Sequence, residues 1–180
     1  FKKSENFERG GDRLRGGDGP LTVSDMCERH DLVDAFINAA VEYGYPKNAD
    51  YNGPEQDGFG YYQVTQKAGR RVSAAGAFLH PVRHRQNLTL VTQARVRKLL
   101  LDGKTVGGVE YEVAGKLTKA LANGNVIVCA GAVQSPQILE LSGIGNPDLI
   151  RSMGLAVSHA LPGVGENYRD HYAARLNWRV

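Results

Sequence analysis

Asn125-Val-Ile-Val-Cys-Ala-Gly-Ala-Val-Gln-Ser-Pro-Gln-Ile-Leu-Glu-Leu-Ser-Gly-Ile-Gly145 is the stretch of this 180-residue sequence that decides the fold. Its apolar start, 125–130, predicts a buried strand, and residues 135–142 predict a helix. The small residues Ala130-Gly131-Ala132 form the turn between the two. Small side chains let the backbone approach a ligand, and a helix start offers free N–H groups, so this turn is typical of a nucleotide-binding sheet. A plain strand-to-helix turn is the alternative interpretation.

The ends of the expected helix carry ordinary boundary signals. Ser135 predicts an N-terminal cap, and Pro136 suits the first helical turn. Gly143 can adopt the left-handed conformation that ends a helix. Cys129, inside the apolar strand, is expected to be a buried small hydrophobic residue.

The rest of the sequence predicts a mixture of helices and strands. Residues 1–29 read as irregular, because they are rich in glycine turn signals. Residues 31–43 place apolar side chains three and four apart, which predicts a helix that ends near Gly44. The remaining predicted elements are strands at 61–66, 88–92, 96–101, 106–113, 117–121 and 156–161, helices at 73–79 and 147–153, and a bulge at Gly107-Gly108.

The stretch around Gly131 also resembles the second signature of the glucose-methanol-choline (GMC) family of flavoprotein oxidoreductases. The positions that match are Gly131, Ala132, Ser135, Pro136, Ile138, Leu139, Ser142, Gly143, Ile144 and Gly145. Further landmarks of the family follow in order along the chain: Phe1-Lys-Lys-Ser-Glu5, Gly17-Asp-Gly-Pro-Leu21, Asp57-Gly-Phe-Gly-Tyr-Tyr-Gln63, Gly69-Arg-Arg-Val-Ser-Ala-Ala75 and Gly163-Val-Gly-Glu-Asn-Tyr-Arg-Asp-His171. The resemblance therefore extends over essentially the whole chain and is strongest to choline-dehydrogenase-like members.

This resemblance implies an α+β (mixed α/β) fold: part of a GMC-type FAD-binding domain with part of its substrate-binding domain. Residues 1–86 resemble substrate-domain and loop material. Residues 87–167 resemble an FAD-domain segment, and 168–180 resemble the start of a returning substrate-domain strand. The Gly-x-Gly-x-x-Gly turn that opens family members is not found in the sequence, and the family's catalytic histidine is expected beyond Val180. The chain is therefore expected to be an internal fragment, with no catalytic residue of its own.

Seven residues are expected, from the resemblance, to contact FAD: Val96, Ala130, Gly131, Ala132, Asn167, Asp170 and His171. The backbone of Val96 corresponds to an adenine contact, although its side chain alone reads as strand core. Asn167, Asp170 and His171 resemble an Asn-x-x-Asp-His motif, with an ordinary polar turn as the alternative. A metal site at Asp170 and His171 is not expected, because adjacent strand residues point to opposite faces.

Tyr61 and Gln63 are the candidate substrate residues. Alternation along a strand places both on one face and Tyr62 on the other. Aromatic side chains in strands more often pack against neighbours, so core packing is the alternative for this face.

The chemistry implied by the resemblance is oxidation of an alcohol, choline or a related primary alcohol, to the aldehyde. A histidine base takes the hydroxyl proton and the flavin accepts a hydride. Because the base and the pyrophosphate loop are not found in this chain, we expect it to bind no FAD and to be inactive in isolation. Two alternatives stay open: a noncatalytic folded module that self-associates through exposed sheet edges, and two polypeptides that assemble into an active enzyme.

Composition excludes several other classes of protein. The net charge is +3, and the lysine and arginine residues are scattered among acidic ones, so no basic stripe for binding nucleic acid is expected. Cys27 and Cys129 do not make a disulfide framework. Ser135 lacks the Gly-x-Ser-x-Gly elbow of hydrolases. No apolar run approaches the roughly 18 residues of a membrane span, and we expect a cytoplasmic or membrane-peripheral protein of bacterial type.

Overall fold

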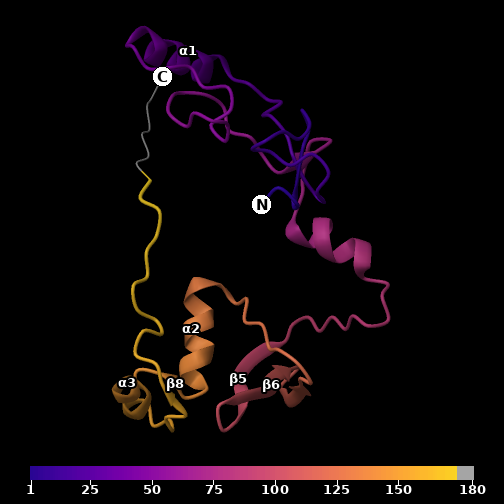
Figure 1. The fold of residues 1–180 in the computed structure, drawn as a ribbon, viewed down its shortest axis with the longest axis vertical. Helices are drawn as coiled ribbons and strands as arrows, with labels where there is room; N and C mark the ends of the chain where they lie inside the picture. Colours follow the sequence, from indigo (N-terminus) through magenta and orange to yellow (C-terminus); the bar gives the residue numbers. More distant parts are fainter. Residues whose placement is uncertain (174–180) are drawn as a thin grey trace. The chain divides into compact units, whose positions relative to one another are not determined.

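The computed structural model describes residues 1–173, and the chain divides into two compact units. The first unit is Phe1–Thr89, and the second runs from Leu90 onward. Both units contain helix and strand (Figure 1), which confirms the α+β class. None of the helices in residues 1–173 is long and apolar enough to cross a bilayer.

The first unit consists of short elements joined by long loops. These are β1 (Glu5–Phe7), β2 (Leu21–Val23), α1 (Asp31–Glu42), β3 (Gln66–Lys67), β4 (Arg70–Arg71), the π-helix η1 (Ala75–Leu79) and the 3-10 helix η2 (His80–Val82). The expectation that 1–29 is irregular is wrong in part, because β1 and β2 form a parallel pair that aligns Glu5 with Leu21. The pair was not recognised because each strand has only three residues, too few to show alternation.

The helix α1 lies where the apolar spacing predicts it. The Nδ1 atom of His30 accepts a hydrogen bond from the backbone N–H of Leu32 at 3.2 Å and so caps the helix. Gly44, with φ of +106°, ends it. On its apolar face Ile37 is buried, while Phe36 stays 55% exposed and meets the ring of Phe59 edge-on at 5.7 Å. The face is therefore only partly covered within this unit.

Two predictions in the first unit need correction. The strand expected at 61–66 is wrong over most of its length, because only Gln66 lies in a strand and Val64 makes a single bridge with Ser24. The helix expected at 73–79 forms as the π-helix η1, and its Ser73 hydroxyl accepts from the N–H of Gly76 at 3.1 Å. The backbone of this segment is held by isolated backbone hydrogen bonds, between Val64 and Ser24 in both directions and from the N–H of Val72 to the carbonyl oxygen of Thr65, rather than by a ladder.

The second unit is built on a three-stranded antiparallel sheet. Its elements are β5 (Arg95–Asp102), β6 (Thr105–Val113), β7 (Lys116–Leu121), α2 (Gly131–Leu141), β8 (Ile144–Gly145), α3 (Pro147–Ser152) and β9 (His159–Ala160). The order β5-β6-β7 confirms the predicted meander. The predicted bulge is also present: Leu100 pairs with Gly108 and Leu101 with Val106, which leaves Gly107 unmatched. A side chain at Gly108 would collide with the carbonyl oxygen of Ala120.

Two of the predicted strands in this unit do not form. Residues 88–92 and 125–130 are rich in residues that favour strands, but they pair with no strand of residues 1–173. A strand is stabilised by its ladder, so a segment without a partner remains extended backbone. As a result Ile127 is 82% exposed, and Cys129 is exposed rather than buried as expected.

The helix α2 begins four residues earlier than predicted. Gly131, with φ of +85°, opens it, so Ser135 is not the cap and Pro136 lies inside the helix. Glycine adopts this left-handed conformation at little cost, which explains the early start. At the other end Gly143 has φ of +82°, as predicted for the stop.

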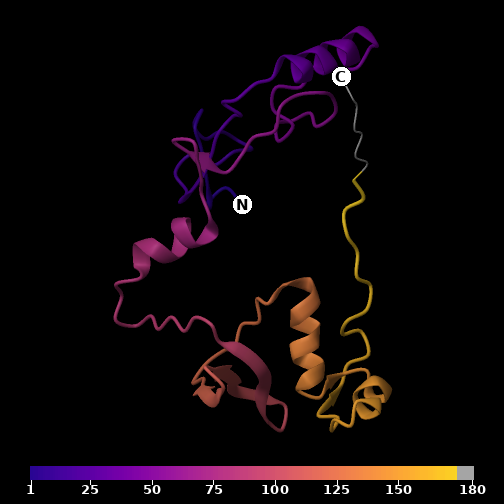
Figure 2. The same cartoon turned by 180° about the vertical axis from the view of Figure 1, so that it is seen from behind.

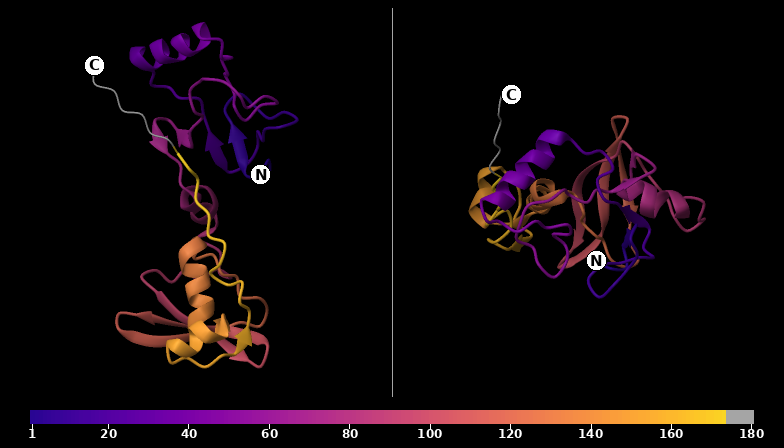
Figure 3. Two further views of the ribbon diagram at one scale, coloured as in Figure 1. Left: turned by 90° about the vertical axis from the view of Figure 1, so that its left-hand side faces the viewer. Right: turned by 90° about the horizontal axis from the view of Figure 1, so that it is seen from above.

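A buried serine joins α2 to the sheet. The hydroxyl of Ser142 accepts from the backbone N–H of Leu99 in β5 at 2.8 Å and donates to the carbonyl oxygen of Ile138 at 2.5 Å. Figure 2 shows α2 beside β5 from behind, and the left view in Figure 3 shows the helix over one face of the sheet.

The last elements of the second unit pack around Ile150, which is fully buried. Asn146 caps α3 through its side chain, and α3 covers the helix predicted at 147–153. The strand expected at 156–161 is reduced to β9, which pairs in parallel with β8. Of the strand expected over 168–180, residues 168–173 are not in a strand, and 174–180 lie outside the described residues.

Candidate functional site

A hollow in the second unit lies between α2 and the segment 164–169. Its volume is about 760 Å³. The residues that line it are Ala132, Val133, Ser135, Pro136, Gln137, Leu139, Glu140, Val164, Gly165, Glu166, Asn167, Tyr168 and Arg169. In Figure 1 this segment runs up along α2. We call this hollow the α2 groove.

One face of α2 supplies a wall of the groove. Ala132, Pro136 and Glu140 recur every four residues, so the helical repeat brings them to the same side. Ser135 adds a hydroxyl at the next position around the helix. The wall is therefore small and apolar near the helix start and acidic near its end.

The start of α2 is free of a side-chain cap. Ala130, the cap residue, makes no side-chain hydrogen bond to the first turn. A Cβ built on Gly131 would meet no atom within 4 Å. The first N–H groups of a helix have no intrahelical partner, so this end can donate to a polar or anionic ligand group.

The opposite wall of the groove is a turn with two left-handed residues. Gly165 has φ of +79° and Asn167 has φ of +57°. A Cβ on Gly165 would lie 3.1 Å from Oε1 of Glu140, so the glycine leaves room for that carboxylate. Asparagine tolerates the left-handed region better than most residues, which accounts for Asn167 at this position.

The structure thus brings together some of the predicted cofactor residues. Ala132 and Asn167, 35 positions apart in sequence, both line the α2 groove, and Ala130 and Gly131 stand at the helix start beside it. Asp170 and His171 do not line the groove. Instead, Oδ1 of Asp170 accepts from the backbone N–H of His171 at 2.8 Å.

Val96 lies elsewhere in the second unit. It pairs with Tyr111 of β6, and its side chain is 37% exposed. Within the described residues β5 is an edge strand, so its outer backbone groups are not used by another strand there. That edge is compatible with the backbone contact expected of Val96.

The two candidate substrate residues belong to the first unit and differ in their surroundings. Tyr61 lines a small hollow of about 160 Å³, where the guanidinium of Arg29 lies 5.1 Å from the centre of its ring. Gln63 is buried and does not line that hollow. Its Oε1 atom accepts from Nδ2 of Asn52 at 3.1 Å, and Nε2 donates to the carbonyl oxygen of Ala49 at 3.4 Å.

Several polar residues of the groove were missed from the sequence. They are Ser135, Gln137, Glu140, Glu166 and Arg169. The helical repeat counted from Ala132 could have identified Glu140, but the helix start was placed at Ser135. No sequence signal indicates Glu166 or Arg169, because a turn rather than a periodic element positions them.

The donor set of the groove suits an organic ligand with polar edges. It offers hydroxyl and amide groups from Ser135, Gln137 and Asn167, and the charged side chains of Glu140 and Arg169. Among residues 1–173 no group of three or more His, Cys, Asp or Glu side chains could hold a metal ion. A ligand held by hydrogen bonds and apolar contact fits the lining better than an ion does.

Comparison with known sequences gives consistent matches over the chain. The profile described as GMC oxidoreductase matches residues 1–173. The chain is 45% identical over 174 residues to the oxygen-dependent choline dehydrogenase of Photobacterium profundum and 45% identical over 171 residues to the mitochondrial choline dehydrogenase of Mus musculus. Each match covers 95% of this chain but only 30% and 29%, respectively, of the relative.

Comparison with solved structures agrees. Pyridoxine 4-oxidase from Mesorbium loti is 35% identical with a TM-score of 0.84, over 90% of this chain and 32% of that protein. An FAD-dependent oxidoreductase from Chaetomium thermophilum is 28% identical with a TM-score of 0.81, over 90% of this chain and 31% of that protein. The chain therefore spans about 30% of the length of the relatives it matches.

Proposed function

Because this chain belongs to the GMC oxidoreductase family, we propose that it forms part of an FAD-dependent enzyme that oxidises choline or a related primary alcohol to the aldehyde. The observation that carries this proposal is the α2 groove, where an uncapped helix start and a distant polar turn line one hollow. The names of the choline dehydrogenases among the relatives support the choice of alcohol. We further propose a cytoplasmic or membrane-peripheral location.

The residues of the α2 groove fit an FAD molecule. We propose that the backbone at Ala130, Gly131 and Ala132 contacts the cofactor, because a side chain at Gly131 is absent and the first-turn N–H groups are free of a cap. Asn167 would donate from its amide across the groove. Val96, Asp170 and His171 stay proposed contacts from the family resemblance, outside the groove itself.

The bound FAD would accept a hydride from the alcohol carbon. The residues of this chain would hold the cofactor and orient the alcohol. The small side chain of Ala132 leaves room in the groove near the helix start. Farther along the helix, the carboxylate of Glu140 lies against Gly165, which has no side chain to displace it. In the first unit Tyr61 lines a hollow, its hydroxyl donates to the carbonyl oxygen of His30 at 3.4 Å, and we propose that it forms part of the wall for the alcohol. We assign no general base to residues 1–173.

The proposal is tested in the longest polypeptide that contains this chain. The gene is sequenced on both sides of the region that encodes this chain, to find a Gly-x-Gly-x-x-Gly motif upstream and a histidine near the C-terminus downstream. The purified polypeptide is then assayed with choline and other primary alcohols. We expect a yellow protein that reduces an artificial electron acceptor when choline is added. A colourless product that contains both motifs and oxidises no alcohol would contradict the proposal.

The 180-residue chain by itself is expected to retain no FAD and to oxidise nothing. The α2 groove is open, and within residues 1–173 only α2 and the segment 164–169 line it. Ligand sites normally bury most of the ligand surface, and these two segments would leave most of FAD exposed. Flavin absorbance in the purified chain, after removal of free FAD, measures this directly.

A second candidate function is supported by exposed apolar residues near strand-like backbone. Ile127 is 82% exposed in the segment 125–129, which is in neither a helix nor a strand, and Leu121 at the end of β7 is 80% exposed. Such surfaces favour pairing with another chain. We propose that the chain self-associates when it is expressed alone. Sedimentation or size-exclusion chromatography at several concentrations tests this, and a monomer at all of them would contradict it.

A further inference from the structure

A buried arginine organises the first unit. The side chain of Arg15 is only 2% exposed, and its Nη2 atom lies 2.7 Å from Oε1 of Glu5, at the start of β1. Its Nη1 atom lies 2.8 Å from Oδ1 of Asp50, in the loop after α1. The guanidinium also lies over the ring of Phe7, 3.8 Å from its centre. One side chain therefore joins the β1 region to the loop around Asp50.

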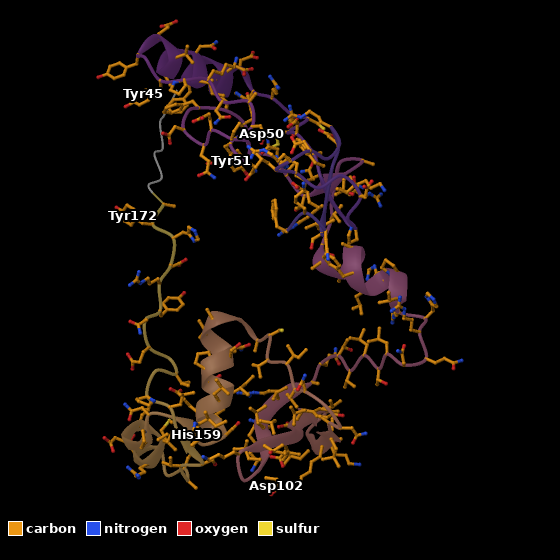
Figure 4. All side chains as sticks on the ribbon, in the orientation of Figure 1. Tyr45, Asp50, Tyr51, Asp102, His159 and Tyr172 are labelled. Carbon is orange, nitrogen blue, oxygen red and sulfur yellow. The ribbon has the colours of Figure 1, made fainter. Side chains whose placement is uncertain are left out.

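The hydrogen bonds continue from Asp50 toward Gln63. The same Oδ1 atom of Asp50 accepts from the backbone N–H of Asn52 at 3.1 Å. The side chain of Asn52 then donates to Oε1 of Gln63 at 3.1 Å. An unbroken series of contacts thus links Glu5, Arg15, Asp50, Asn52 and Gln63. Figure 4 shows Asp50 and Tyr51 on this loop.

The loop and the segment 59–63 are also held together through backbone. The N–H of Asn48 donates to the carbonyl oxygen of Phe59 at 2.9 Å. A side chain at Gly60 would collide with the carbonyl oxygen of Asn48. A shift of the loop therefore displaces the backbone that leads to Tyr61 as well as the amide of Gln63.

The contacts at Arg15 depend on the shape of its side chain. Its Nε atom donates to Oε1 of Glu5, with Nη2 in ion-pair contact with the same oxygen, while Nη1 donates to Asp50, so the planar fork serves two carboxylates at once. A lysine has the charge but lacks this geometry. Removing one member of a buried ionic group leaves the others without compensation, so the group acts as a unit.

We propose that Asp50, which Arg15 holds in place, is a positioning residue that acts through Asn52 to fix the amide of Gln63. The role of Tyr61 at an alcohol pocket rests on the proposed function, whereas the series of hydrogen bonds from Asp50 to Gln63 does not. On this account Gln63 itself acts as the last member of the network, because both ends of its amide are engaged within the unit.

The test uses the 180-residue chain labelled with nitrogen-15 and follows the side-chain amide signal of Gln63 by NMR, assigned through its loss in Gln63→Glu. Asp50→Ala removes the acceptor shared by Arg15 and Asn52. We expect the Gln63 amide signal to move and its protons to exchange at least about fivefold faster with solvent, the factor that a lost hydrogen bond implies. Asp50→Asn, whose amide oxygen can still accept both bonds, should restore most of the original behaviour.

Two further variants keep the test decisive. Asn52→Ala leaves the ion pairs of Arg15 in place and should shift the Gln63 signal as Asp50→Ala does. Asp25→Ala removes an exposed ion pair with Arg9 in the same unit and should leave the Gln63 signal unchanged. If Asp50→Ala and Asn52→Ala fold and the Gln63 amide neither shifts nor exchanges faster, the proposal is wrong. Because no cofactor or alcohol is needed, a failed alcohol assay leaves this result unaffected.

Discussion

The two units are stabilised by different kinds of interaction. In the first unit the buried residues include the polar and charged Glu5, Arg15, Ser24 and Gln63, beside the apolar Phe7, Ile37 and Ala77. In the second unit they include Leu99 in the β5–β6 ladder, Ile150 in α3 and the polar Ser142. In the first unit a buried ion-pair network joins the strand β1 to the loop around Asp50, whereas in the second unit the hydroxyl of Ser142 joins α2 to β5 of the sheet. The two candidate sites therefore depend on different parts of the sequence.

The largest effect is expected from Arg15→Met. It leaves Glu5 buried without its partner, and breaking a buried pair costs about 3–5 kcal/mol. Hydrogen exchange followed by mass spectrometry, which reports each unit separately, should show the loss in peptides of the first unit. Arg97→Met, which removes an exposed pair with Glu112 in the second unit, should cost no more than about 1 kcal/mol. If Arg15→Met and Arg97→Met lowered the free energy of unfolding by the same amount, the distinction drawn between the two units would be wrong.

The next largest effect is expected from Ile150→Ala in the second unit. Ile150 is fully buried, and truncating such a side chain costs about 2–5 kcal/mol. Exchange should quicken in β8, α3 and β9 and stay unchanged in the first unit. Leu149→Ala, at a neighbouring side chain that is 44% exposed, serves as the control and should cost much less. Equal protection from hydrogen exchange in the two variants would contradict the claim that these elements pack around Ile150.

A smaller effect is expected from Ser142→Ala. The substitution leaves the N–H of Leu99 without its acceptor, which costs about 1–3 kcal/mol for a buried donor. The amide of Leu99 should exchange faster, while the β6–β7 ladder keeps its protection. Ser152→Ala, whose exposed hydroxyl donates within α3, is the matched control. An unchanged Leu99 amide would show that Ser142 does not join α2 to β5.

The smallest effect concerns pH. The backbone N–H groups of Arg15 and Leu14 donate to Asp12, and they hold the pKa of this carboxyl below its ordinary value of 3.8. A carboxyl whose pKa is depressed in the folded state adds stability above its ordinary pKa, and this is lost as the pH falls through the lowered value. An NMR titration of Asp12 should therefore show a midpoint below 3.8, and Asp12→Asn should remove the effect on the 12–15 turn. A midpoint at or above 3.8 would contradict it.

The same difference explains what could be predicted from sequence. The meander of β5, β6 and β7 was predicted because alternation and a Gly-Gly bulge are local patterns. The strand predicted at 125–130 does not form within the described residues, since composition indicates strand tendency but not whether a partner strand exists. The network of Arg15 was invisible, because its members are far apart in sequence and show no period.

The candidate site divides in the same way. Ala132 and Asn167 were identified through the family resemblance, and the structure places both on one groove. Glu140 was not predicted, because Ala132 was placed before the helix and its four-residue spacing to Pro136 and Glu140 was therefore not considered. Contact with a cofactor remains a prediction for all of these residues, and Val96, Asp170 and His171 moreover lie outside the groove.

The most direct test of the central claim is the FAD content of the longest polypeptide that contains this chain, compared between Ala132→Phe and Ala120→Phe. The first substitution fills the α2 groove, and the second places the same ring on an exposed strand away from it. If the groove holds the cofactor, Ala132→Phe should weaken FAD retention by at least about tenfold, or 1.4 kcal/mol, while Ala120→Phe retains it. Full FAD content in Ala132→Phe would contradict the claim that this groove faces the flavin nucleotide.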